Sequence, residues 1–195
     1  ENVVRIMSIH KSKGLEFPIV FVSGCGKRLN TQDINASILI HQDLGFGPDY
    51  VDCERRIVHT TIPKEALRCR LRQETISEEL RILYVAFTRA REKLIITGLV
   101  KDANKAAARW CDCADTDSPK LSEYDILKGS CYLDWIGPAL ARHKDCKEIR
   151  ELAGIGTGEL KLLDDGSSWS VKLWNKSDIT ADRFEEKRAE VNILE

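Results

Sequence analysis

Three short apolar runs are the first pattern along the chain. Residues 3–9, 19–22 and 94–97 are rich in Val, Ile and Leu, which is the composition of buried strands. Gly24 and Gly98 end the second and third runs. Because both faces of each run are apolar, the pattern predicts a parallel sheet that is covered by helices on each side.

The longest helical signal covers residues 63–91. Pro63 suits a first helical turn, and Thr75 with Glu78 resembles a capping box, which predicts a break near Thr75. Shorter helices are expected over residues 101–113 and 132–143. A buried stripe is expected along the long helix, formed by Ile76, Leu80, Leu83, Tyr84 and Phe87.

Weaker patterns fill the remaining segments. Residues 37–40 suit a strand, and residues 43–48 have the composition of a turn. Residues 159–163 and 169–174 alternate apolar and polar positions on either side of a turn, which predicts a β-hairpin. The charged stretch from residue 178 predicts a partly exposed helix.

These elements predict an α/β fold, in which a partial parallel sheet flanked by helices precedes a mixed helical and β-hairpin connector. The composition turns acidic around residues 112–130. We therefore expect a division into residues 1–115, a connector over residues 116–177 and a charged linker over residues 178–195.

Composition and charge narrow the possible functions. The chain has 195 residues, is 43% hydrophobic and has a formal net charge of -1, so a globally basic nucleic-acid coat is excluded. No apolar run approaches the roughly 20 residues that a membrane span needs. The seven cysteines include no C-x-x-C pair, which indicates free thiols in a reducing cytoplasm without a zinc or iron–sulfur site. The first residue is not Met, and we expect a segment of a longer protein.

Two segments carry candidate chemistry. The loop of residues 10–16 lies between two expected strands and holds a His, two Lys, a Gly and a Glu, which could meet phosphate, sugar and base, although a solvated loop has the same composition. Residues 88–91 end the long helix and contain Arg89 and Arg91. Either arginine could act as an arginine finger on a phosphoryl group or could simply cap the helix dipole. The pattern alone leaves both interpretations open.

Three other patterns are weaker. Residues 24–28 look like half a P-loop but have Arg28 where Ser or Thr binds magnesium, and no G-x-x-x-x-G-K-[ST] occurs in the chain. The glycines of residues 154–158 follow no clear strand and predict a flexible turn. Asp145 and Lys147 match the D-x-K of metal-dependent nucleases, but no paired upstream acid is evident.

Two long motifs identify a family. Residues 4–18, VRIMSIHKSKGLEFP, resemble motif V of UvrD/Rep-type superfamily 1 helicases, and residues 78–91, EELRILYVAFTRAR, resemble their motif VI. Residues 43–47, DLGFG, and 132–140, YLDWIGPAL, are similar to the AddA subunits of bacterial AddAB helicase–nucleases. The helicase resemblance covers about residues 1–100, and the looser AddA-like resemblance extends to about residue 175.

The resemblance implies roles for individual residues. His10 and Lys11 would contact the DNA strand, while Gly14 and Glu16 would approach the nucleotide. Arg89 corresponds to the motif VI arginine that contacts the γ-phosphate. Supporting roles fall to Tyr84, Thr88 and Ser8, the last in a place where many relatives have Thr.

The resemblance also implies an activity. The chain would be the C-terminal part of a second RecA-like domain with a connector toward a nuclease domain. Its parent would be a cytoplasmic, ATP- and Mg²⁺-dependent 3′-to-5′ DNA helicase and exonuclease that repairs double-strand breaks. That parent would bind single- and double-stranded DNA and an AddB-like subunit, without a membrane.

Alone, the chain is expected to bind no cofactor and to hydrolyse no ATP. Two alternatives stay open: a non-catalytic DNA- or protein-binding module with a degenerate helicase fold, and a UvrD-type helicase without a nuclease.

Overall fold

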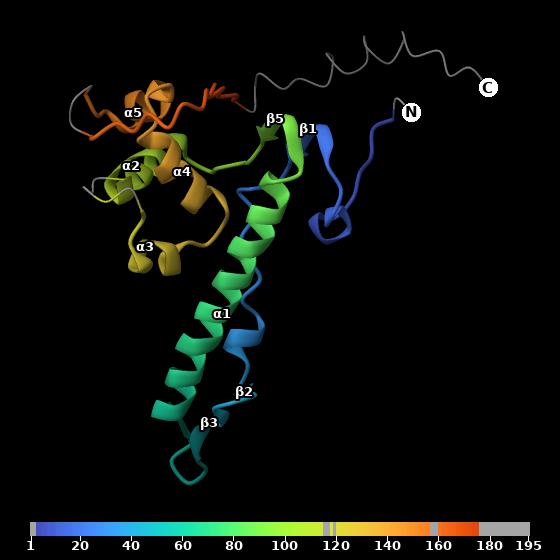
Figure 1. Cartoon of the computed structure of the whole chain (residues 1–195). Helices are drawn as coiled ribbons and strands as arrows, with labels where there is room; N and C mark the ends of the chain where they lie inside the picture. The colour runs from blue at the N-terminus through green and yellow to red at the C-terminus, as the bar shows by residue number, and fades with distance from the viewer. Residues whose placement is uncertain (1–2, 115–117, 119, 157–159, 176–195) are drawn as a thin grey trace.

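The computed structural model describes residues 3–114, 118, 120–156 and 160–175. Its first sheet pairs β1 (Phe17–Val22) with β5 (Ala90–Ile96) in parallel, with Val20 opposite Leu94. The helix α1 (Ile62–Phe87) lies against this pair and extends far beyond it (Figure 1). The α/β fold and the parallel pairing predicted from the sequence are therefore confirmed.

The first apolar run does not form the predicted strand. Residues 3–8 are irregular and lead into the short 3₁₀ helix η1 (Ile9–Ser12). Val4 and Ile6 are 94% and 98% exposed, because no described strand pairs with this segment. On β1, Ile19 and Phe21 are also exposed, so α1 covers one face of the strand pair, and no helix of the described residues covers the face that carries these two side chains.

The helix α1 is continuous over 26 residues. The Thr61 hydroxyl caps its first turn by accepting from the Lys64 amide, next to Pro63. The predicted break near Thr75 is wrong, because the Thr75 hydroxyl donates to the Leu71 carbonyl at 2.8 Å from within the helix. Tyr84, a member of the predicted buried stripe, is 70% exposed.

A three-stranded antiparallel sheet packs on the N-terminal half of α1. It contains β2 (Ile38–His41), β3 (Gly45–Asp52) and β4 (Ile57–Thr60). The turn between β2 and β3 covers only residues 42–44, so the predicted turn over residues 43–48 is too long. Gly47 lies inside β3. A glycine is needed at this position because a Cβ would come within 2.7 Å of the Lys64 Cα.

A buried ammonium group fastens this sheet to α1. The Lys64 side chain is 4% exposed, and its Nζ donates to the Asp49 carboxylate at 2.5 Å and to the Ser37 carbonyl at 2.8 Å. Nearby, the His41 ring contacts the Glu74 carboxylate at 3.2 Å, and this hydrogen bond lowers the pKa of Glu74. The sheet therefore depends on polar contacts with the helix as well as on apolar packing.

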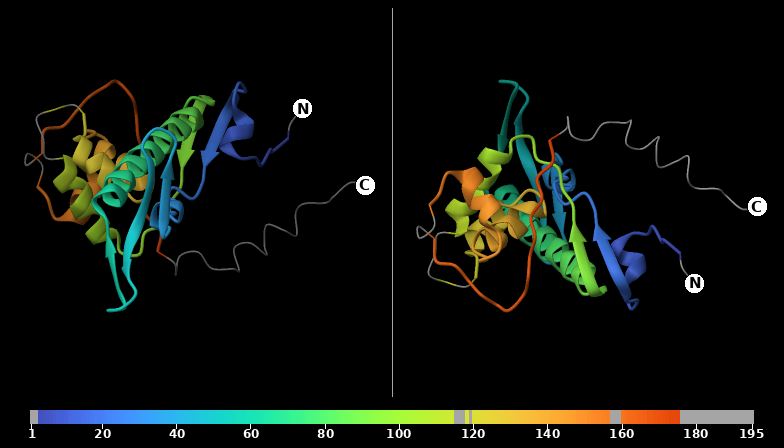
Figure 2. Two further views of the ribbon diagram at one scale, coloured as in Figure 1. Left: turned by 90° about the horizontal axis from the view of Figure 1, so that it is seen from below. Right: turned by 90° about the horizontal axis from the view of Figure 1, so that it is seen from above.

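Four helices gather on one side of α1, with β1 on the other side (Figure 2). They are α2 (Ala103–Ala114), α3 (Glu123–Lys128), α4 (Leu133–Ala141) and α5 (Lys147–Ala153). One buried cluster joins α4 to α1 and β1 through Trp135, Ile136, Ile76, Leu83 and Val22. A second cluster joins α4 to α2 and α5 through Ala141, Ala107, Cys111, Cys146 and Ile149. Helix α4 therefore belongs to both clusters.

The predicted hairpin over residues 159–174 is absent from the described part, which starts again at residue 160. Leu163 instead forms a single parallel bridge with His143. Trp169 and Val171 pack on the second buried cluster. They belong to an irregular segment, residues 160–175, that we call the strap. The alternation of apolar and polar positions correctly marked side chains that pack inward, but they pack onto helices and not onto a second strand.

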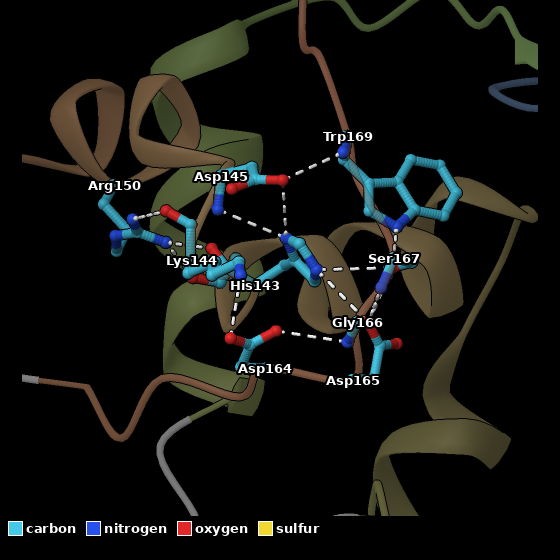
Figure 3. A network of polar contacts seen from close by, with 10 residues as sticks. His143, Lys144, Asp145, Arg150, Asp164, Asp165, Gly166, Ser167 and Trp169 are labelled. Atoms are coloured by element: carbon cyan, nitrogen blue, oxygen red, sulfur yellow. Dashed lines mark hydrogen bonds and ion pairs between the residues drawn. The ribbon is translucent and has the colours of Figure 1, made fainter.

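A group of polar contacts, which we call the clasp, holds the strap in this position (Figure 3). It consists of His143, Asp145, Asp165, Ser167 and Trp169. The buried His143 ring accepts from the Asp145 amide at Nδ1, so its Nε2 faces Ser167 and Asp165, each at 3.3 Å. The Asp145 carboxylate accepts from the Trp169 amide at 3.1 Å. Hydrogen bonds from Ser167 lower the pKa of Asp165 to about 2, which keeps this carboxylate charged beside the ring. These contacts fix the strap against the turn between α4 and α5.

The glycines and acids singled out as weak candidates have structural roles. Gly26 lets the chain pass the Leu99 backbone, since a Cβ would meet the Leu99 carbonyl oxygen at 2.1 Å. Gly154 ends α5 with a φ of 73°, a conformation that favours glycine. The Asp145 carboxylate belongs to the clasp, where it accepts from the Trp169 amide. The helix expected from residue 178 lies outside the described residues.

The thiols are unpaired, and most of them are buried. Cys25, Cys111, Cys131 and Cys146 are buried, whereas Cys53 and Cys69 are exposed. Burial raises the pKa of Cys25 and that of Cys146 to about 11. Cys113, two residues after Cys111 in α2, instead directs its Sγ toward Asp125. The two cysteines of the C-x-C pair therefore face different surroundings.

Removing the buried ammonium group should unfold the chain more easily. Lys64→Ala leaves the Asp49 carboxylate without its buried partner, and we expect a loss of about 3 kcal/mol in the free energy of unfolding. The measurement is urea denaturation followed by circular dichroism. Lys105→Ala is the control, because the Lys105 side chain is 88% exposed and, among the described residues, pairs with Asp102 alone, so less than about 0.5 kcal/mol should be lost. Equal losses in both variants would show that the buried ion pair stabilises the fold no more than an exposed one.

Thiol labelling should separate the cysteines into two groups. In the native chain Cys53 and Cys69 should react readily with Ellman's reagent at pH 8. Cys25 and Cys146 should react about a hundredfold more slowly, because a raised pKa leaves little thiolate and burial limits access. Mass spectrometry of the labelled peptides assigns the sites, and denaturation should make all seven cysteines reactive. A fast reaction at Cys146 in the native chain would contradict the described packing.

Candidate functional site

Arg89 lies in the turn between α1 and β5, where its guanidinium joins two segments that are far apart in sequence. Nε donates to the Val85 carbonyl at 2.9 Å, and Nη2 donates to the Thr88 hydroxyl at 3.0 Å. Nη1 donates to the Leu15 carbonyl at 2.9 Å, across to the loop of residues 10–16. The Arg89 carbonyl accepts from the Phe17 amide at 2.9 Å. The candidate arginine and the candidate loop are therefore in direct contact.

The contacts that orient the Arg89 guanidinium leave some of its N–H donors available. An arginine has five N–H donors, and the three contacts above use one from each nitrogen. One N–H on Nη1 and one on Nη2 are left without a partner in the described residues. A fixed fork with two available donors suits a bidentate contact with a phosphate group.

Thr88 supports this orientation, whereas the Tyr84 side chain does not. The Thr88 hydroxyl accepts from Arg89 and contacts the carbonyls of Tyr84 at 3.0 Å and Val85 at 3.1 Å. Tyr84 contributes only its main-chain carbonyl to this arrangement, because its side chain points into solvent. Ser8 accepts from the Lys11 amide through its own carbonyl, at the start of η1.

The loop presents its polar side chains to solvent. His10 and Lys11 lie on η1 and are exposed, while the Ser12 hydroxyl is buried and donates to the Ile9 carbonyl at 2.6 Å. Gly14 has a φ of 82° and open space around its Cα, so its backbone can be approached closely. The exposed Glu16 carboxylate lies 4.0 Å from Nε of Arg91, the other arginine of this segment.

The position of the loop differs from the sequence-based expectation in one respect. Because residues 3–8 are not a strand here, the loop follows an irregular segment and precedes β1. It therefore lies at the amino ends of β1 and β5, beside the turn that holds Arg89. The proximity of loop and arginine was not derivable from the sequence, since the acceptor at Leu15 is a main-chain carbonyl.

Neither a metal-ligating cluster nor a membrane helix accompanies this site in the described ranges. In residues 3–114, 118, 120–156 and 160–175, no group of three or more His, Cys, Asp or Glu side chains could hold a metal ion. No helix of the same ranges has the length and apolar character needed to cross a membrane.

Comparison with known proteins supports the family resemblance seen in the sequence. A family model described as the UvrD-like helicase C-terminal domain matches residues 1–101. The chain is 55% identical over 194 residues to the AddA-type protein of Acetivibrio thermocellus, an ATP-dependent helicase/nuclease subunit, covering 100% of this chain and 16% of that protein. It is 53% identical over 192 residues to the protein of the same name from Clostridium botulinum strain Loch Maree, covering 98% of this chain and 15% of that protein. The chain thus spans about a sixth of the length of these relatives.

Proposed function

Because the chain belongs to the UvrD-like helicase C-terminal domain family, we propose that it supplies the nucleotide- and DNA-contacting loops of a second RecA-like motor domain. The observation that carries this proposal is the guanidinium of Arg89, which is held by the loop carbonyl of Leu15 and keeps two N–H groups available. An arginine that only capped a helix would have no need of an acceptor in a loop 74 residues away.

The parent protein that we propose is an ATP-dependent DNA helicase and nuclease subunit. Support comes from relatives that are 52–55% identical across nearly the whole chain and are named as ATP-dependent helicase/nuclease subunits. We further propose a 3′-to-5′ polarity, a role in double-strand-break repair in the bacterial cytoplasm, and an AddB-like partner subunit. These finer points rest on the resemblance of motifs V and VI and of residues 43–47 and 132–140.

Arg89 would act on the γ-phosphate of ATP bound between two RecA-like domains. The residues present fit a phosphate group, because the guanidinium is oriented by Val85 and Thr88 before any ligand arrives. ATP with Mg²⁺ supplies the phosphoryl transfer itself. The chain's contribution is to place a positive, planar fork where negative charge develops, while the phosphate cradle and the magnesium ligands would come from other parts of the parent.

The same residue gives a route for coupling ATP to DNA. If Arg89 shifts toward a phosphate, its bond to the Leu15 carbonyl must stretch or carry the loop with it. That loop continues through Gly14 to η1, on which His10 and Lys11 face solvent. We propose that these two residues contact single-stranded DNA, and that Glu16 contacts the nucleotide sugar from the opposite end of the loop.

The division of the chain is proposed as well. Residues 1–115 would form the C-terminal part of the motor domain, residues 116–177 a connector, and residues 178–195 a linker toward a nuclease domain. Support comes from the family match, which ends at residue 101, and from helices α3, α4 and α5, which follow it.

In the full-length enzyme, Arg89→Ala should abolish most ATP turnover. We expect kcat to fall roughly 10³-fold, the effect of losing an arginine finger, while equilibrium DNA binding changes little. Arg89→Lys should not restore the rate, because an ammonium cannot bond Val85, Thr88 and Leu15 together and still meet a phosphate. Steady-state ATPase assays with saturating DNA measure the effect.

Arg81→Ala is the matched control for this variant. Arg81 lies on the same helix, is exposed and pairs with Glu78 at 3.4 Å, so its loss should leave kcat unchanged. Melting temperatures of all three variants show whether the loop has been loosened. An Arg89→Ala enzyme that keeps more than about a third of the wild-type rate would return Arg89 to a capping role.

The two ends of the loop should differ in their effects. Glu16→Ala should raise KM for ATP more than it weakens DNA binding, and His10→Ala should do the reverse, because the two side chains leave opposite ends of the loop. Fluorescence anisotropy with single-stranded DNA and ATPase kinetics would be measured on both variants. Equal losses in both assays would mean that the loop is only a hinge.

A further inference from the structure

A second concave site lies away from Arg89. It is a cavity of about 260 Å³ between the segment after β1, the middle of α1 and the link from α3 to α4. Its polar lining consists of Arg28, Thr31, Arg72, Thr75 and Ser130, and its apolar lining includes Leu29, Ile34 and Ile76. Two arginines and no carboxylate line this cavity, which makes it a positively charged site.

The arginines of α1 show which charges are already neutralised. Arg68 pairs with Glu65, Arg70 with Glu74 at 2.8 Å, and Arg81 with Glu78. Arg72 alone among them has no carboxylate partner in the described residues. The helix positions three and four residues away on either side of it hold Arg68, Cys69, Thr75 and Ile76, none of them acidic. The one arginine of α1 without a neutralising acid is the one that lines the cavity.

Arg72 is also held in place. Its Nε and Nη2 both donate to the Leu127 carbonyl, at 3.1 and 2.8 Å. This double contact fixes the plane of the guanidinium and leaves both N–H groups of Nη1 without a described partner. The side chain is therefore oriented before any ligand binds, which lowers the entropy cost of binding one.

Arg28 contributes a second charge from another wall. It is exposed and has no ion pair in the described residues. The other hydroxyls of the lining are partly committed: Thr75 donates to Leu71, and Ser130 donates to Asp134, whose carboxylate pairs with Arg109. The donors left for a ligand are the two arginines and the Thr31 hydroxyl.

We propose that this cavity binds a phosphate group, held between the guanidinium groups of Arg28 and Arg72. Planar guanidinium donors with no competing carboxylate are the arrangement that selects phosphate. The neighbouring groove between α1 and α3 gives the contrast, because it carries Arg70 and Arg81 together with Glu74, Glu78 and Glu123. A balanced lining of that kind does not favour an anion.

The phosphate has two possible sources, the backbone of single-stranded DNA and free inorganic phosphate. The DNA source rests on the proposed function, since it needs a chain that meets DNA; the free-phosphate source does not. Backbone binding here would be independent of base sequence, because no base-reading group lines the cavity.

The experiment uses the 195-residue chain and five single variants, two in the cavity, two controls and His10→Ala. Arg28→Gln and Arg72→Gln each remove one charge from the cavity, and Arg28→Gln breaks no described hydrogen bond, so it tests the site even if Arg72→Gln is unstable. Lys27→Gln and Arg70→Gln are the matched controls, because each removes one charge beside the cavity without touching its lining. Binding of a fluorescein-labelled 12-nucleotide oligothymidylate is followed by anisotropy at several salt concentrations, and binding of inorganic phosphate by calorimetry.

The proposal expects both cavity variants to weaken binding roughly fivefold and both controls to change it less than about twofold. If DNA is the source, oligonucleotide affinity falls, and the salt dependence, the slope of log K against log salt, falls by about 0.7, the value for one phosphate contact on a single strand. If free phosphate is the source, only the phosphate affinity falls.

Other results would overturn the proposal. They are equal effects in cavity and control variants, no effect of either cavity variant, or no binding of either probe by the unchanged chain. His10→Ala separates the two proposals: an oligonucleotide affinity that depends on His10 and not on Arg28 or Arg72 supports the motor loop and rejects the cavity site. Phosphate binding without any oligonucleotide binding keeps the cavity and rejects the DNA contacts of the loop.

Discussion

The bond between the Arg89 guanidinium and the Leu15 carbonyl holds the two candidate segments together. It is paired with a second bond, from the Phe17 amide to the Arg89 carbonyl, which begins the pairing of β1 with β5. Side chain and main chain of one residue thus fix both the loop and the register of the parallel strands. A change at Arg89 would therefore disturb the loop as well as the proposed phosphate contact, because the donors that orient the guanidinium also anchor the loop.

The sequence predicted the elements whose signals are local. The long helix and the pairing of the second and third apolar runs follow from periodicity, turn residues and β-branched composition, which act over a few residues. The strand predicted from residue 3 onward is wrong because a strand needs a neighbouring strand, and no described strand pairs with residues 3–8. The hairpin failed because the apolar positions Trp169 and Val171 found helices to pack on, and His143 fixed the intervening turn. At the candidate site, the roles proposed for Arg89 and Thr88 come from the motif resemblance and stay predictions, whereas the acceptor at Leu15 could not be predicted, since main-chain carbonyls carry no sequence signal.

The arginines of α1 also differ in whether their contacts can be predicted from the sequence. Acids spaced three or four residues from Arg68, Arg70 and Arg81 neutralise these arginines within the helix, a pattern that can be read from the sequence. Arg72 lacks such an acid and turns instead to the Leu127 carbonyl, which lies 55 residues away and becomes visible only in the fold. Local pairing thus distinguishes arginines whose charge is neutralised within the helix from Arg72, whose charge has no carboxylate partner in the described residues.

The two buried clusters determine how any movement would be transmitted. Helix α4 contributes Trp135 and Ile136 to the cluster on α1 and Ala141 to the cluster with α2 and α5. The Tyr132 hydroxyl donates to Glu79 of α1 at 2.5 Å, and the Leu133 amide donates to the Cys25 carbonyl after β1. Because close-packed interiors deform little, helices fastened at so many points move as one body with α1. A displacement of the turn that carries Arg89, at the end of α1, would therefore be passed to α2, α4 and α5, and the bond to the Leu15 carbonyl would pass it to the exposed loop of residues 10–16 as well.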